Sequence, residues 1–200
     1  WGEKYPWQKD NEVNNKIISE SKITYFNPKI VLEGGSIDVN GEGTCLTTST
    51  CLLNLNRNGN LTVEKMEEYL KSYMGVKKII WLKGTLKGDD TDGHVDNLAR
   101  FVNHTTIVYV SEKDESNENY LSLKGIEKSL KKARDPNGKP FKLIPLPMPR
   151  KIKNNNFYLP ASYANFYIGN NAVLLPAFND PNDKIAQNIL QSCFPRKKIV

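Results

Sequence analysis

The sequence has little of what marks membrane proteins and zinc proteins. It contains no run of eighteen apolar residues, so we expect no transmembrane helix and no membrane partner. Its first residues do not resemble a signal or transit peptide. Its three cysteines, Cys45, Cys51 and Cys193, are an odd number without the paired spacing of a zinc site. These absences predict a soluble protein with reduced thiols, located in the cytoplasm.

Acidic residues are outnumbered as well, since the formal net charge is +6. The lysines are scattered through the expected helices and loops, so we interpret the excess as a solvated surface and expect no nucleic-acid partner. A basic binding module without catalytic activity stays open as an alternative, and its sign would be nucleic-acid affinity that falls with salt. Two hundred residues with 38% hydrophobic content fit one domain or a large part of a bigger one.

The sequence has only two histidines, and one of them lies in its densest acidic stretch. Residues 89–96 contain His94 and four aspartates. In an extended backbone His94 and Asp96 would point to the same side. An imidazole beside a carboxylate is a common arrangement for acid/base catalysis. The stretch could equally be a solvated acidic loop in which the histidine only packs or caps.

The same stretch would also allow a metal site. Carboxylates and an imidazole at this density suit manganese or zinc. A metal-dependent hydrolase is therefore an alternative, with the ligands Asp90, Asp92, His94 and Asp96. Metal titration would separate it from an enzyme that needs no metal.

Three segments of the chain share one expected order of elements, which is a β-hairpin, a helix and a strand. They are expected at about 30–82, 98–146 and 164–200. The strongest signal is Asn40-Gly41, which stands between two alternating runs as in a tight hairpin turn. The hairpins are predicted at 36–48, 98–110 and 164–178, and the helices at 62–74, 118–134 and 181–193. A helix at 10–19 and a strand at 22–26 are predicted to precede them.

Repeated ββαβ units that cannot each close a core must pack around a common axis. Their pre-hairpin loops then meet at one end. The first of these loops carries Glu33-Gly34-Gly35, the second carries His94 and Asp96, and the third is residues 160–163. We therefore expect a glutamate, a histidine and an aspartate from distant parts of the sequence to line one pocket. The alternative is that these are three unrelated turns.

Several stretches resemble motifs of the agmatine deiminase family, in the peptidyl-arginine-deiminase-like branch of the guanidino-group-modifying superfamily. They are residues 33–37, 41–44, 91–102, 159–168 and 178–181. The resemblance covers essentially the whole chain. It implies an α/β propeller of ββαβ units around a pseudo-fivefold axis, with about three units present, and places residues 1–200 in a single deiminase domain.

The resemblance also implies a reaction in putrescine and polyamine biosynthesis. Agmatine and water would give N-carbamoylputrescine and ammonia, without a metal or an organic cofactor. The implied partner is thus a small guanidine, and a homo-oligomer is compatible with the pattern. Peptidyl-arginine or a related guanidine is the alternative substrate.

The resemblance further assigns roles to individual residues. Glu33 matches the carboxylate that orients the histidine, and His94 matches the general acid/base. Asp96 matches an aspartate that binds the substrate guanidinium, whose planar paired donors suit a carboxylate. Trp1 and Asp92 are assigned to substrate binding in the same way.

One part of the family pattern does not occur in the chain. The family's nucleophilic cysteine lies in a glycine-rich Gly-Gly-Asn-Ile-His-Cys type motif, expected after a strand that begins at Lys197, and the sequence stops at Val200. Cys45, Cys51 and Cys193 are expected to be core or filler residues. We therefore expect the nucleophile to lie beyond residue 200 and the 200-residue chain alone to be inactive.

Overall fold

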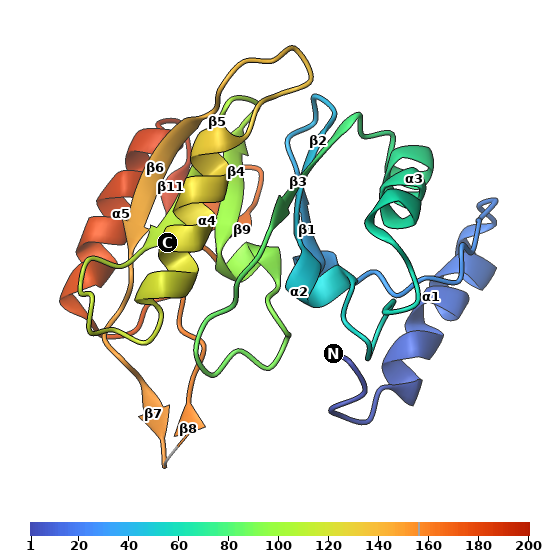
Figure 1. The fold of residues 1–200 in the computed structure, drawn as a ribbon, viewed down its shortest axis with the longest axis horizontal. Coiled ribbons are helices and arrows are strands. Elements are labelled where there is room, and N and C mark those ends of the chain that lie inside the picture. The colour runs from blue at the N-terminus through green and yellow to red at the C-terminus, as the bar shows by residue number, and fades with distance from the viewer. Residues whose placement is uncertain (156) are drawn as a thin grey trace.

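Three mixed sheets of three strands each organise the chain in the computed structural model, which describes residues 1–155 and 157–200 (Figure 1). In each sheet two consecutive strands pair antiparallel, and a third strand returns parallel to the second. A parallel return needs a crossover connection, which a helix supplies in each case. The observed order is the hairpin, helix and strand expected from the sequence, and the result is an α/β fold.

The first sheet contains β1 (Ile37–Val39), β2 (Thr44–Thr48) and β3 (Lys78–Leu82). In the turn between β1 and β2, Gly41 has a φ of 75°, which a residue with a Cβ adopts only under strain. The side-chain oxygen of Asn40 accepts a hydrogen bond from the backbone N–H of Thr44. The Asn-Gly pair therefore closes the hairpin in the way that its sequence predicts.

Two helices connect β2 to β3. The short helix α2 (Ser49–Leu52) follows β2 directly and was not expected from the sequence. The longer helix α3 (Val63–Met74) begins where the Thr62 side chain accepts a hydrogen bond from the backbone N–H of Lys65, and it ends at Gly75, whose φ is 67°.

The second sheet contains β4 (Ala99–Asn103), β5 (Thr106–Ser111) and β6 (Lys142–Pro147), and the third contains β9 (Tyr167–Ile168), β10 (Ala172–Leu174) and β11 (Lys198–Ile199). Their crossover helices are α4 (Tyr120–Lys132) and α5 (Pro181–Cys193). Helix α5 has the predicted bounds, because Asp180 caps its first turn and Pro181 suits its first position. Figure 1 shows α3 and α5 at opposite sides of the view, with strands of the sheets between them.

Side chains of β2 and β3 alternate between two apolar clusters. Cys45 and Ile79 pack in a smaller cluster with residues of α3, whereas Leu46 and Ile80 belong to the main core shared with the second and third sheets. All five residues of β2 are buried as a result. The carboxyl end of β2 is therefore buried, and there the Thr48 hydroxyl donates a hydrogen bond to the carbonyl of Gly93, the residue before His94.

Two regions differ from the sequence prediction. The predicted strand at 22–26 is wrong, because residues 23–33 lie outside all helices and strands and Ile23 and Phe26 are exposed. A small hairpin of β7 (Lys153–Asn154) and β8 (Phe157–Tyr158) was not predicted. The predicted first helix does form, as α1 (Gln8–Ser21), but it buries none of its side chains. No helix within residues 1–155 and 157–200 has the length and apolarity to cross a membrane.

Candidate active site

Two short 3₁₀ turns bring Glu33 and His94 together. Glu33 directly precedes the turn Gly34–Ser36, and His94 directly precedes the turn Val95–Asn97. A Cβ on Gly35 would lie 2.5 Å from Nδ1 of His94 and 2.6 Å from Oδ2 of Asp96. Any residue other than glycine would therefore force the histidine or the aspartate out of position. Gly35 thus allows the loop that carries His94 and Asp96 to approach the loop that carries Glu33.

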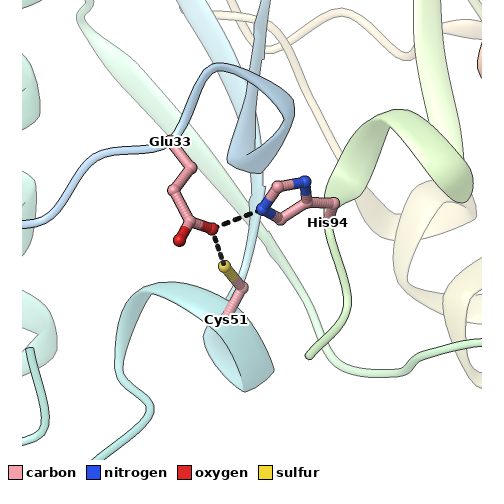
Figure 2. A group of neighbouring side chains, drawn as sticks. All are labelled: Glu33, Cys51 and His94. Atoms are coloured by element: carbon pink, nitrogen blue, oxygen red, sulfur yellow. Dashed lines mark hydrogen bonds and ion pairs between the residues drawn. The ribbon is translucent and has the colours of Figure 1, made fainter. Parts of the chain in front are cut away.

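The carboxylate of Glu33 holds the imidazole of His94. Oε2 of Glu33 lies 2.5 Å from Nε2 of His94 (Figure 2). The histidine is almost completely buried. Burial opposes the charge of Glu33, but hydrogen bonds from His94 and Arg57 outweigh it and lower the pKa of Glu33 to about 2. The carboxylate is therefore ionised throughout the neutral range, and it fixes the ring of His94 in one orientation.

A buried arginine that the sequence did not single out lies on the other side of Glu33. The side chain of Arg57 is 1% exposed, and it donates from Nε to Oε1 of Glu33 at 3.1 Å and from Nη2 to Oε2 at 2.9 Å. Its Nη1 donates to Oδ2 of Asp92 at 2.7 Å. A lone arginine in a polar loop between α2 and α3 has no periodic or motif signal, so only the structure reveals it.

Asp92 lies behind the site. Its carboxylate accepts hydrogen bonds from Lys4 at 2.6 Å, from Asn56 at 3.0 Å and from Arg57. Burial opposes its charge, but these hydrogen bonds and the charge of Lys4 lower the pKa of Asp92 to about 2. Direct contact between Asp92 and a substrate stays a prediction, and in this structure its oxygens are occupied by protein donors.

A cavity of about 490 Å³ opens in front of the Glu33–His94 pair. All three pre-hairpin loops contribute to its lining, which includes Glu33, His94, Asp96 and Ser162. Trp1 lines it as well, and its ring lies at 85° to that of His94, with 6.3 Å between the ring centroids. The expected convergence of the loops is thus present in the fold, with Trp1, Glu33, His94 and Asp96 around one space.

Asp96 contributes an unpaired oxygen to this region. Its Oδ1 is buried and has no hydrogen-bond partner among the described residues. Burial raises the pKa of Asp96, and the positive charges of His94 and Arg100 oppose that rise. A buried carboxylate oxygen without a donor is costly, so it is a point at which a bound cationic group would be stabilised.

The four ligands expected for a metal-dependent hydrolase, which are Asp90, Asp92, His94 and Asp96, do not lie around one point in the described residues. Asp90 accepts a hydrogen bond from the hydroxyl of Tyr5, and Asp92 faces Arg57 instead of His94. Over residues 1–155 and 157–200, the His, Cys, Asp and Glu side chains close enough to share an ion are Glu33, Cys51 and His94. The guanidinium of Arg57 contacts the same Glu33 oxygens and would repel a cation there.

The thiols of the chain are poor nucleophiles at neutral pH. Burial raises the pKa of Cys45 and of Cys51 to about 12, and it also raises the pKa of Cys193. The thiolate is the reactive form of cysteine, so none of the three is activated. Cys51 is buried, as expected of a core residue, and its Sγ lies 4.0 Å from Oε2 of Glu33 (Figure 2).

Comparison with known proteins gives a consistent result. Residues 1–200 match the family described as Porphyromonas-type peptidyl-arginine deiminase. Agmatine deiminase from Pseudomonas aeruginosa is 36% identical over 98% of this chain, which spans 58% of that protein. A substrate-bound agmatine deiminase variant from C. jejuni is similar over the whole chain, with a TM-score of 0.92, 43% identity and 59% of its own length covered. Agmatine deiminase of Enterococcus faecalis has a TM-score of 0.91 and 33% identity, with 98% of this chain and 59% of that one covered.

Proposed function

The chain belongs to the Porphyromonas-type peptidyl-arginine deiminase family, and on that premise we propose that it forms part of an agmatine deiminase. The relatives that carry this name match nearly all of the chain, which spans somewhat less than two thirds of their length. The proposed reaction converts agmatine and water to N-carbamoylputrescine and ammonia. Such a step belongs to putrescine and polyamine biosynthesis.

The observation that carries the proposal is the unpaired carboxylate oxygen of Asp96 beside the His94 cavity. A guanidinium is planar, permanently charged and presents parallel N–H donors, so it can pair with a carboxylate through two hydrogen bonds. Binding would satisfy Asp96 and hold the guanidinium carbon next to His94. A guanidinium therefore combines a permanent charge with a fixed fork of donors, which a single ammonium group lacks.

The charges around the cavity favour agmatine over free arginine. Among its described lining residues are three carboxylates, those of Glu33, Asp90 and Asp96, and neither lysine nor arginine is present. Agmatine is cationic at both ends, whereas arginine adds a carboxylate that would meet this acidic lining. Like charges in a partly buried site cost several kcal/mol, so we infer a preference for the decarboxylated substrate.

The proposed chemistry assigns His94 a proton-transfer role. A cysteine thiolate would attack the guanidinium carbon, and His94 would give its proton to the departing ammonia as the C–N bond breaks. His94 would then take a proton from a water molecule, whose oxygen attacks the same carbon as the C–S bond breaks. The pKa of each of the three thiols in residues 1–200 is raised. We therefore assign the nucleophile to a cysteine that lies outside residues 1–200.

We extend the proposal to the assembly of the fold. The three ββαβ units would be part of a five-unit α/β propeller, within a single deiminase domain. Their mixed sheets and outer crossover helices support this arrangement. A cytoplasmic location and a homo-oligomeric state fit a polyamine enzyme and complete the proposal.

The proposal is tested by the substrate preference of the full-length protein. We expect ammonia release from agmatine with a kcat/KM about 100-fold above that for free arginine, because of the acidic lining. An arginine-containing peptide serves as the third substrate. If the peptide were turned over faster than agmatine, the enzyme would be a peptidyl-arginine deiminase instead, which is the alternative suggested by the family description.

A second prediction concerns Glu33, which contacts His94 directly. Replacing Glu33 with glutamine should lower kcat about 100-fold and change KM less than about threefold, because orientation of the imidazole is lost while Asp96 still binds the guanidinium. Steady-state ammonia release measures both constants. If KM rose more than kcat fell, then Glu33 would be the residue that binds the substrate and the two assignments would have to be exchanged.

A further inference from the structure

Arg57 contacts Glu33 beside the cavity but has no role in the proton transfers proposed for His94. We propose that Arg57 is a positioning residue, which holds the carboxylate of Glu33 in the orientation and the ionised form that His94 needs. The inference rests on the proposed function for its catalytic consequence. Its structural part, the control of Glu33 by Arg57, is independent of which guanidine is the substrate.

The geometry of Arg57 leaves Glu33 little freedom. Both oxygens of Glu33 are engaged by the guanidinium, at 3.1 Å from Nε and 2.9 Å from Nη2. Two parallel hydrogen bonds of this kind fix the plane of a carboxylate as well as its position. Because the Oε2 atom held in this way is also the partner of Nε2 of His94, the fork of Arg57 determines where the imidazole is held.

Arg57 is itself locked by further contacts. Its Nη2 donates to the backbone carbonyl of Thr91 at 3.0 Å, and its Nη1 donates to Oδ1 of Asn56 at 3.0 Å and to Asp92. Asp92 is held in turn by Lys4. The anchor Asp92 lies two residues before His94, so the same guanidinium ties the loop before His94 to the loop that carries Glu33.

Arg57 does not line the cavity itself, and Glu33 is the catalytic side chain that it contacts directly. The arginine is absent from the described lining that contains His94 and Asp96, and its side chain is 1% exposed. A buried guanidinium is stable only when its charge is matched, and here Glu33 and Asp92 match it. A residue that supported only the fold would need no bidentate contact with the carboxylate that holds the general acid/base.

The contact between Arg57 and Glu33 also favours the ionised form of Glu33. The titratable groups that face Glu33 are His94, Arg57 and the thiol of Cys51. Arg57 is the one of these whose charge is permanent and buried. Without it, ionised Glu33 would depend on its contact with His94 alone.

The test compares two substitutions of Arg57 in the full-length protein. Arg57→Gln removes the charge, and Arg57→Lys keeps the charge but loses the fork. The first readout is the titration of the Glu33 carboxyl carbon by NMR, which needs no substrate. The second readout is the pH profile of kcat with agmatine. The control is Arg150→Gln, because Arg150 also pairs with a carboxylate, that of Asp180, but is exposed and is absent from the described lining of the cavity.

The two substitutions should separate the effect of the Arg57 charge from the effect of its two parallel hydrogen bonds. In Arg57→Gln the pKa of Glu33 should rise by at least about one unit from its value of about 2, and the acid limb of the kcat profile should move up with it. In Arg57→Lys the Glu33 titration should stay within about half a unit of wild type, while kcat falls about 10-fold because one ammonium cannot hold both oxygens. Arg150→Gln should change neither readout.

The sign of the stability change provides a check on folding. The pKa of Glu33 is depressed in the folded state, so its ionised form stabilises the fold above pH 4.5 and this contribution is lost as pH falls toward 2. In Arg57→Gln that contribution should be smaller, because only His94 still lowers the pKa of Glu33, so the difference in stability from wild type should shrink as pH falls through this window.

An unchanged Glu33 titration in Arg57→Gln would overturn the inference, whatever happened to turnover. Equal losses of kcat in Arg57→Gln and Arg57→Lys without any movement of the pH profile would also overturn it, since they would indicate a purely structural arginine. A wild-type protein inactive on agmatine would instead refute the proposed function, and the NMR titration would still decide whether Arg57 controls Glu33.

Discussion

Replacing Asp96 with asparagine in the full-length protein should lower kcat/KM for agmatine by about 10³-fold. The Oδ1 atom of Asp96 is buried without a partner, and the substrate guanidinium is the group we expect to satisfy it. Loss of one partner of a buried, hydrogen-bonded charge pair costs about 2–5 kcal/mol, and each 1.4 kcal/mol is tenfold in binding. An asparagine has the same shape but carries no charge and one acceptor fewer, so the loss should appear mainly in KM.

The stability of this variant separates a binding role from a folding role. A buried carboxylate oxygen without a donor does not stabilise the folded protein, so Asp96→Asn should not lower the melting temperature. Asp114→Asn is the matched control, because Asp114 is an exposed aspartate on a surface loop. Turnover of Asp96→Asn within about threefold of wild type would show that the guanidinium is bound elsewhere. A fall in both activity and melting temperature would indicate that Asp96 holds the fold.

The 200-residue chain by itself should release ammonia from agmatine at least about 10⁴-fold more slowly than the full-length protein. Glu33, His94 and Asp96 are in place in the chain, but the three thiols are held in the unreactive protonated form by burial. Removal of a covalent nucleophile leaves only the catalysis due to binding and positioning, which is many orders of magnitude weaker.

The measurement is ammonia release by equal concentrations of the short chain and the full-length protein. Circular dichroism of the short chain must show helix and strand, because apolar side chains of the third sheet such as Tyr167 and Leu174 are exposed and favour aggregation. Comparable rates would mean that Cys45, Cys51 or Cys193 is the nucleophile after all, or that the reaction is not covalent. Replacement of each cysteine by serine in the short chain would then decide between these explanations.

The parts of the fold that the sequence predicts are those with strong local signals. Asn40-Gly41 requires a tight turn, and Asp180-Pro181 requires a helix start, so the first hairpin and α5 occur where expected. The strand predicted at 22–26 has the right alternation of apolar residues but no neighbouring strand among the described residues. Alternation indicates that a segment can form a strand, whereas pairing depends on what the fold places beside it.

Some residues of the candidate site could likewise be predicted from the sequence, and others could not. The positions of Glu33, His94 and Asp96 in pre-hairpin loops could be predicted, because the repeat brings those loops to one end. The direction of Asp92 could not be predicted, because its backbone has a φ of 63°, outside an extended strand, and its side chain pairs with Arg57, which has no sequence signal. The positions of Arg57 and Cys51 follow from tertiary packing after β2, where no periodic pattern points to a shared partner. Supporting residues are thus harder to find from sequence than the residues that they support.

The central claim of this account is that Asp96 binds a guanidinium beside His94, and a crystal structure of the full-length protein with agmatine tests it most directly. We expect an Asp96 carboxylate oxygen within about 2.9 Å of a guanidinium nitrogen, as in other charge-assisted hydrogen bonds, with the guanidinium carbon facing His94. Agmatine bound with its guanidinium away from Asp96, and Oδ1 of Asp96 still without a partner, would contradict the claim.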